Sequence, residues 1–285
     1  MREINSLLDI APQTDAFFID IFGVLWNGEG YFPHALSVME ALEKEGKKIY
    51  ILSNSTTVSK YLKEKHDVLG MKQGIHYTKI VPSADVLKEK MEQENFLDTV
   101  MGKDGKFTII GRPNDRLFEK VLDRYTPDLD KASAVYFGSL EVIPGEDLET
   151  LDPFLPDAEK ALKKELPAIC ANPDHFAFRG QTKHVVQGLL GKWYEDRGGK
   201  VYWFGKPYPE IYEYTLKLSN TVPEKTVMVG DTIRTDVKGA KDCGLKTVLI
   251  TETGITHDLL TSGETLEEIA LREGAFPDYL LKELK

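Results

Sequence analysis

The segment from Ala16 to Trp26, with the sequence AFFIDIFGVLW, constrains the fold more than any other part of the chain. Ala16 to Ile19 and then Ile21 are apolar, and Asp20 alone interrupts them. An apolar run without alternation predicts a strand that is buried on both faces, which is typical of a parallel sheet. Asp20 then lies at the carboxyl end of that strand, at the edge where open parallel sheets bind ligands. Taken alone, Asp20 is as consistent with the opening of a turn, because Asp and Gly are common turn residues.

The residues after Trp26 predict a strand–helix–strand unit. Apolar residues at helical spacing in residues 35–42 indicate a helix that Gly46 ends, and residues 48–52 (KIYIL) form a second apolar strand. This succession is the βαβ unit of parallel sheets. The second strand ends in Ser53, Asn54 and Ser55, whose polar groups can donate hydrogen bonds to an anion. The same residue types are preferred helix caps, and for this segment alone capping is the favoured interpretation.

Residues from about 84 to 202 show a second pattern, in which helical stretches (84–95, 115–125 and 155–166) alternate with short apolar runs (FTIIG, SAVYFG and AIC). The pattern predicts a second α/β unit inserted at 92–200, with 1–91 and 201–285 forming the first domain. A length of 285 residues also favours two domains. The apolar run that begins at Val201 is expected to resume the first sheet.

Two further strand ends carry charged residues. Lys206 follows the apolar run at 201–204 and precedes a helical stretch, while Asp231 and Asp236 follow an apolar strand at 226–229. A helix is expected at 235–243, then Gly244 as its end and a strand at 246–250. Because a parallel sheet gathers its carboxyl-end loops at one edge, we expect Asp20, Ser53 and Asn54 to converge there with Lys206 and the two later aspartates.

Such a cluster indicates a particular chemistry. Three neighbouring carboxylates repel one another unless a cation lies among them, and Mg²⁺ prefers carboxylate, water and phosphate oxygens, so Mg²⁺ is the expected cofactor. A lysine supplies a point charge for a phosphate oxygen or keeps a neighbouring aspartate ionised. An ionised aspartate beside a metal-bound phosphate is a competent nucleophile. The cluster therefore predicts phosphoryl transfer through a phosphoaspartate.

Composition argues against several other classes. The net charge is −10 and no Lys/Arg stripe occurs, which disfavours nucleic acid as a partner. Cys170 and Cys243 lack the spacing of a disulfide framework or a zinc site, and a reducing, cytoplasmic location is expected. The first residues lack the apolar centre of a signal peptide, and no segment approaches the length of a bilayer span, so no membrane partner is expected.

Four motifs together resemble the haloacid dehalogenase-like hydrolases, specifically the NagD-like (subclass IIA) phosphatases with an α/β cap between the second and third motifs. In order they are D-I-F-G-V-L-W, S-N-S-T, G-K-P followed by P-E-I-Y, and G-D-T-I-R-T-D with V-K-G-A. The resemblance covers essentially the whole chain. It implies a doubly wound, Rossmann-like parallel sheet core with an inserted α/β cap. Asn172-Pro173-Asp174 is similar to the cap segment that reaches the active site in such proteins.

The resemblance also implies a role for individual residues, and a homodimer through the cap is the family expectation. Asp20 is the expected nucleophile, and Lys206 is expected to act with it and to contact the phosphoryl group. The expected metal site comprises Asp20, Asp231, the backbone carbonyl of Phe22 and, in its outer shell, Asp236. The expected substrate contacts are Ser53, Asn54, Ser55, Lys206, Asn172, Asp174 and His175.

The chain departs from this family at Phe22, where family phosphatases carry an aspartate as general acid and base. The first hypothesis is a Mg²⁺-dependent phosphatase for a small phosphorylated metabolite, with a sugar phosphate as the leading guess. Its missing acid would come from the cap, the substrate or water, with His175 and His34 as candidates. The second is a weak or inactive protein that binds a phosphorylated metabolite. The third and least favoured is a haloacid dehalogenase, since those members also lack the second aspartate and need no Mg²⁺.

Overall fold

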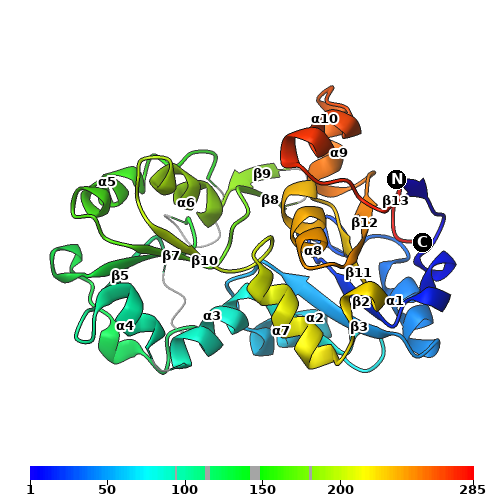
Figure 1. Ribbon diagram of the computed structural model, residues 1–285, viewed down its shortest axis with the longest axis horizontal. Coiled ribbons are helices and arrows are strands. Elements are labelled where there is room, and N and C mark those ends of the chain that lie inside the picture. Colours follow the sequence, from blue (N-terminus) through cyan, green and yellow to red (C-terminus); the bar gives the residue numbers. More distant parts are fainter. Residues whose placement is uncertain (94, 113–115, 142–147, 180–181) are drawn as a thin grey trace.

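The computed structural model describes residues 1–285 except 94, 113–115, 142–147 and 180–181. Two lobes lie side by side along its longest axis (Figure 1). The larger one, the core lobe, is built on a seven-stranded sheet in which every neighbouring pair is parallel. The strands in spatial order are β1 (Arg2–Glu3), β13 (Tyr279–Leu281), β12 (Lys246–Ile250), β11 (Thr226–Gly230), β2 (Ala16–Ile19), β3 (Lys48–Ser53) and β4 (Lys79–Pro82).

Strand β2 lies inside this sheet, between β11 and β3, and is buried on both faces, as its unbroken apolar sequence predicts. Successive side chains of a strand point to opposite faces. Phe17 and Ile19 therefore pack in the cluster that contains the apolar side of helix α1, whereas Phe18 packs in the cluster on the other face. Asp20 is the first residue beyond the strand, with its backbone N–H bonded to the carbonyl of Val229 at 2.9 Å.

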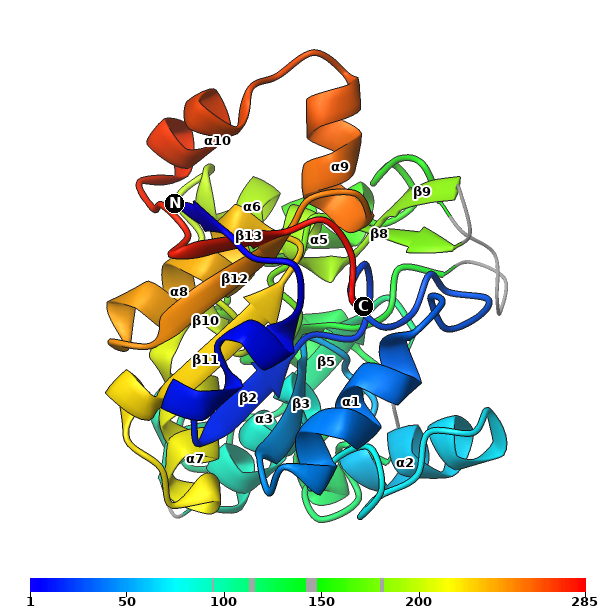
Figure 2. The same ribbon diagram turned by 90° about the vertical axis from the view of Figure 1, so that its right-hand side faces the viewer.

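Helices cover both faces of the core sheet. Figure 2 shows α1 on one side of β2 and β3, with α7 and α8 on the other. The helices of the chain, with a π-helical turn before α8, are α1 (Ala35–Lys44), α2 (Ser59–Val68), α3 (Ser83–Glu92), α4 (Phe96–Met101), α5 (Leu155–Lys163), α6 (Gln187–Glu195), α7 (Pro209–Ser219), the turn (Ile233–Val237), α8 (Lys238–Asp242), α9 (Gly254–Thr261) and α10 (Leu266–Glu273). Alternation of strand and helix around a parallel sheet confirms the predicted α/β class.

The smaller lobe, the cap lobe, has a four-stranded parallel sheet of its own. Helices α5 and α6 cover one of its faces through buried residues such as Ala158 and Leu190. An antiparallel hairpin leaves this lobe and lies between the two lobes in Figure 1. The sheet order is β10 (Val201–Trp203), β7 (Ala168–Cys170), β6 (Ala134–Phe137) and β5 (Phe107–Ile110), and the hairpin is β8 (Phe176–Arg179) with β9 (Thr182–Val185).

Two sequence-based expectations differ from this arrangement. The strand that begins at Val201 pairs with β7 in the cap sheet and does not resume the core sheet. The described part of the helix expected at 115–125 consists of turns and a short 3₁₀ segment, Leu122–Arg124, while residue 115 itself lies outside the described residues. In that stretch Phe118 packs its ring against the rings of Phe107 and Tyr136, so burial of the aromatic ring replaces a regular helical face.

Two further expectations concern the insertion between the core segments and membrane-spanning helices. An α/β insertion between the two core segments is present, but the boundaries at 92 and 200 stay a prediction, and β10 places the return to the core lobe after Trp203. Among the residues that the structure describes, no helix combines the length and the apolar character that a bilayer crossing requires.

Candidate active site

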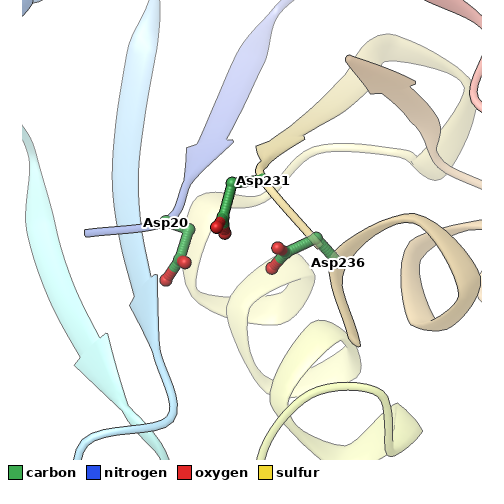
Figure 3. A group of neighbouring side chains, drawn as sticks. All are labelled: Asp20, Asp231 and Asp236. Atoms are coloured by element: carbon green, nitrogen blue, oxygen red, sulfur yellow. The ribbon is translucent and has the colours of Figure 1, made fainter. Parts of the chain in front are cut away.

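Three aspartates meet at the carboxyl end of the core sheet. Asp20 follows β2, Asp231 follows the neighbouring strand β11, and Asp236 lies on the π-helical turn after β11. Each offers a carboxylate oxygen within 4.8 Å of the others, and Figure 3 shows the three groups gathered in one place. Adjacent parallel strands bring their ends to one sheet edge, so residues more than two hundred positions apart become neighbours.

Lys206 joins two of these aspartates. Its Nζ lies 2.7 Å from Asp20 Oδ1 and 2.7 Å from Asp236 Oδ1. The lysine side chain is 2% exposed and that of Asp236 1% exposed, so this ion pair is shielded from water. Burial on its own would lower the pKa of Lys206, but the carboxylates of Asp20, Asp236 and Asp174 raise it above its ordinary value. The lysine therefore stays charged throughout the neutral range.

The two strand-end aspartates experience a different electrostatic balance. Burial raises the pKa of Asp20 to about 7, with Lys206 opposing this effect and Asp236 adding to it. Burial, together with Asp236 and Asp20, raises the pKa of Asp231 well above its ordinary range. Asp231 forms no ion pair with any described residue; its Oδ2 accepts a hydrogen bond from the N–H of Ile255 at 2.6 Å. One lysine thus faces three carboxylates, and negative charge remains in excess.

Two glycines make room for Asp231. A Cβ atom built on Gly23 or on Gly254 would overlap the Asp231 carboxyl group, and both glycines have a positive φ, 77° and 72° respectively. Only a residue without a side chain fits such a position without strain. Gly23 belongs to the D-I-F-G sequence, but Gly254 opens helix α9 and was not identified from the sequence.

Asn54 connects the lysine to the cap lobe. Its Oδ1 accepts the backbone N–H of Lys206 at 2.7 Å, while its Nδ2 donates to the Lys206 carbonyl at 2.9 Å and to Asp174 Oδ1 at 3.1 Å. The side-chain amide is therefore occupied with protein partners. Ser53 Oγ accepts from the backbone N–H of Ser55 at 3.2 Å, and both serines lie at the end of β3 as expected. Phosphoryl binding by Ser53, Asn54 and Ser55 stays a prediction.

The segment from Asn172 to His175 reaches the same site from the cap lobe. Asn172 Oδ1 accepts the N–H of Asp174 at 3.0 Å, which fixes the turn, and Asn172 Nδ2 donates to Gln187 of α6 at 3.2 Å. On the core side, Arg234 donates to the carbonyl of Pro173 at 2.8 Å. Arg234 had no predicted role, although it stands between the two aspartates in G-D-T-I-R-T-D.

A cavity of about 1400 Å³ lies between the lobes. Lys206 and Asp236 do not line this cavity. His34, the second histidine proposed as an acid, is an exposed residue at the start of α1 and does not line it either. The expected site residues that line the cavity are Asp20, Phe22, Ser53, Asn54, Ser55, Asn172, Asp174, His175 and Asp231.

The cavity also contains residues that sequence patterns did not single out. Lys183 of β9 lies 2.8 Å from Asp258 of α9, an ion pair that links the hairpin of the cap lobe to the core lobe. Neither His257 nor Asp258 had a predicted role. Both line the cavity, and the carboxylate of Asp258 is 39% exposed there. No local pattern indicates this pairing, because its two residues are far apart in the chain.

The family follows from a direct comparison. A family model for haloacid dehalogenase-like hydrolases matches residues 14–244. The chain belongs to this family. The match spans the four motifs and includes the residues that form the aspartate–lysine cluster. The resemblance stated from the sequence is thereby confirmed, and the chain is an enzyme of the hydrolase type.

Relatives of this hydrolase include a named phosphatase and chronophin. The 4-nitrophenylphosphatase of Schizosaccharomyces pombe is 24% identical over 313 residues, covering 99% of this chain and 95% of the relative. Chronophin of Homo sapiens is 25% identical over 257 residues, covering 88% of this chain and 86% of the relative.

Solved structures of the same type agree with the fold. A haloacid dehalogenase-like hydrolase from Brucella suis 1330 superposes with a TM-score of 0.83 at 26% identity, over 99% of this chain and 100% of that one. NagD from Escherichia coli K-12 superposes with a TM-score of 0.63 at 21% identity, over 95% and 96% of the two chains. The haloacid dehalogenase-like core with an inserted cap is therefore shared over nearly the whole length.

Proposed function

We propose that this hydrolase is a Mg²⁺-dependent phosphatase that cleaves a small phosphorylated metabolite through a phosphoaspartate on Asp20. The observation that supports this proposal is the clustering of Asp20, Asp231 and Asp236 around one buried lysine. The names of relatives such as the 4-nitrophenylphosphatase support phosphomonoester cleavage. A structure described as a possible sugar phosphatase, from Cytophaga hutchinsonii, shares the fold with a TM-score of 0.79 at 21% identity over 99% of this chain and 98% of that chain, and a sugar phosphate remains the leading substrate class.

The residues present fit a magnesium ion. All three side chains offer oxygen atoms, the donor that Mg²⁺ prefers, and their charge exceeds what Lys206 balances. Asp20, Asp231 and the backbone carbonyl of Phe22 would hold the ion, with Asp236 in its outer shell. When bound, Mg²⁺ supplies positive charge that orients the phosphoryl oxygens and stabilises the charge of the transition state.

The protein residues then divide the chemistry. A carboxylate oxygen of Asp20 attacks phosphorus, and the charged Lys206 favours the ionised form of Asp20 while offsetting negative charge at the reacting group. Ser53 and the residues after it present donors to the phosphoryl oxygens at the end of β3. Asn54 holds Lys206 in place through both groups of the lysine backbone. The cavity between the lobes accommodates the rest of the substrate and limits access of water.

The nucleophile is tested with Asp20→Asn. The variant should release no phosphate from a panel of aryl, acyl and alkyl phosphates with Mg²⁺ present, because an amide is a poor nucleophile. Asp15→Asn is the matched control, since Asp15 is an exposed residue at the opposite end of β2. Turnover that survives D20N, or full activity of the wild type in excess chelator, would refute the proposal.

Two other outcomes point to the remaining hypotheses. A wild type that binds phosphate esters without turnover, and gains activity only as Phe22→Asp, would be a metabolite-binding protein. Release of halide from a haloacid in the presence of chelator would indicate a dehalogenase. The homodimer and the cytoplasmic location stay predictions.

A further inference from the structure

Position 22 leaves the proposed phosphatase without its usual acid. Phe22 lines the cavity two residues after Asp20 and is 39% exposed, but its ring can neither donate nor accept a proton. Cleavage of an alkyl phosphate expels a basic alkoxide, and a general acid contributes about 10² to 10⁴ in rate to such a step. The proposed function, on which this inference rests, therefore leaves a place for another side chain of the cavity to supply that proton.

Besides Asp20, three residues of the expected site that line the cavity carry an acidic or imidazole group: Asp231, His175 and Asp174. Asp231 is fixed by the N–H of Ile255 and belongs to the expected metal site. His175 is a weak donor, because burial, with Arg234, lowers the pKa of its ring to about 4 and keeps it neutral. Asp174 remains. Of the three residues, it alone is hydrogen-bonded to Asn54, which also binds the backbone of Lys206.

Asp174 is held at the site from both lobes. Its Oδ1 accepts the Nδ2 hydrogen of Asn54, whose other contacts are with the backbone of Lys206. The backbone of its turn is fixed by Asn172 on the cap side and by Arg234 on the core side. A residue anchored in this way keeps a defined position relative to Asp20, which is what a proton donor requires.

The second oxygen of the Asp174 carboxyl group is available. Oδ2 has no hydrogen-bond partner among the described residues, and the side chain lines the same cavity as Asp20. We propose that Asp174 is the general acid and base of this enzyme, in place of the aspartate that family phosphatases carry at the position of Phe22. As Asp20 bonds to phosphorus and the ester P–O bond breaks, the Oδ2 proton of Asp174 passes to the leaving oxygen. The Asp174 carboxylate then takes a proton from the water that attacks phosphorus, which releases phosphate and regenerates both aspartates.

The surroundings of Asp174 favour its protonated form. Burial raises the pKa of its carboxyl group, and Asp236 adds to this rise. Lys206 and Arg234, together with the hydrogen bond from Asn54, act in the opposite direction without reversing the rise. A carboxylic acid whose pKa is moved toward the working pH is suited to donating a proton and recovering it.

The proton transfer is tested with Asp174→Asn. Asparagine keeps the size of the side chain and an oxygen that accepts the Asn54 N–H, but it has no acidic proton. We measure kcat/KM with two esters. The leaving group of 4-nitrophenyl phosphate departs without a proton, whereas the leaving group of glycerol 2-phosphate needs a proton to depart. The aryl-to-alkyl ratio of kcat/KM should rise about 100-fold or more in D174N. Asp104→Asn, an exposed aspartate in the loop before β5, is the matched control and should leave the ratio unaltered.

Rescue separates an acid from a purely structural residue. The Phe22→Asp substitution should restore turnover of glycerol 2-phosphate in the D174N variant. The increase in kcat/KM that F22D causes in D174N should be at least about tenfold larger than the increase it causes in the wild type. Equal losses for both esters in D174N, or no recovery with F22D, would overturn the proposal.

If D174N does not fold, as judged by thermal unfolding, F22D alone decides the question. A gain above about tenfold for the alkyl ester shows that the wild type lacks an acid and overturns the proposal, and a smaller gain supports Asp174. A wild type that releases no phosphate from either ester contradicts the proposed function instead.

Discussion

Burial raises the pKa of the Asp20 carboxyl group into the neutral range, so its protonated and ionised forms compete there. Its pKa of about 7 arises mainly from burial among other carboxylates, whereas the expected ligand role requires the ionised form. A cation bound at the cluster would reverse this effect, because opposite charge favours the ionised carboxylate. The residue thus couples metal binding, pH and stability, and the coupling has a definite sign.

The stability of the metal-free protein should fall as pH rises. In the unfolded chain Asp20 ionises near 3.8, and in the folded chain near about 7. Between those values the folded state holds a proton on Asp20 that the unfolded state has released. The stabilising contribution of this proton is therefore complete below pH 4 and is lost as pH rises through 7. Between pH 5 and pH 7 the free energy of unfolding should drop by about 2 kcal/mol more in the wild type than in D20N.

Denaturant unfolding of both proteins in chelator measures this difference. Parallel pH dependences for the two would contradict the coupling. Adding Mg²⁺ to the wild type should flatten its dependence, because metal binding competes with the proton for the same carboxylate.

At the scale of elements, the first turn of helix α9 packs against Asp231 of the expected metal site. The N–H of Ile255 holds Asp231, and Gly254 brings the backbone close enough for that contact. Helix α9 lies far from β2 in the sequence, so this support depends on how the two elements pack in space (Figures 1 and 2).

Substitution of Gly254 by Ala should weaken Mg²⁺ binding. The new Cβ would overlap the Asp231 carboxyl group, whereas Gly263→Ala introduces the same change at a positive φ with nothing within 4 Å. G263A therefore reports the backbone strain alone, about 1 kcal/mol of destabilisation. We expect the thermal shift on adding Mg²⁺ to be lost in G254A and retained in G263A. Equal Mg²⁺ shifts in the two variants would show that Asp231 tolerates displacement.

At the scale of the whole molecule, two contacts join the lobes at the cavity. Asp174 is hydrogen-bonded to Asn54, and Lys183 forms an ion pair with Asp258. Both residues of the second pair are 39% exposed, so the pair contributes little to overall stability. Its effect is expected on the position of the hairpin β8–β9 over the cavity.

Charge reversal tests this contact between lobes. Asp258→Lys should lower kcat/KM a few-fold while changing the free energy of unfolding by less than about 1 kcal/mol, because exposed ion pairs are weak. The double variant K183D/D258K should recover most of the lost kcat/KM by restoring opposite charges. If D258K retains the wild-type kcat/KM, the hairpin has no role in substrate binding or closure.

The sequence by itself determined the α/β class and most strand ends. Apolar runs at 16–19, 49–52 and 248–250 define buried strands, because burial on both faces favours apolar residues whatever the strand's neighbours are. The same logic placed Asp20 and Asp231 at one edge, since parallel strands end together. Motif order then added the family and the expected role of each residue.

Only the tertiary structure decided which sheet and which partner each segment joins. Strand β10 has the apolar pattern of a core strand, yet it pairs with β7, because pairing depends on neighbours that are distant in sequence. The link from Asn54 to Asp174 and the pair of Lys183 with Asp258 depend on how the lobes pack. Local patterns record burial and turn chemistry, whereas contacts between lobes arise from the packing of the whole chain.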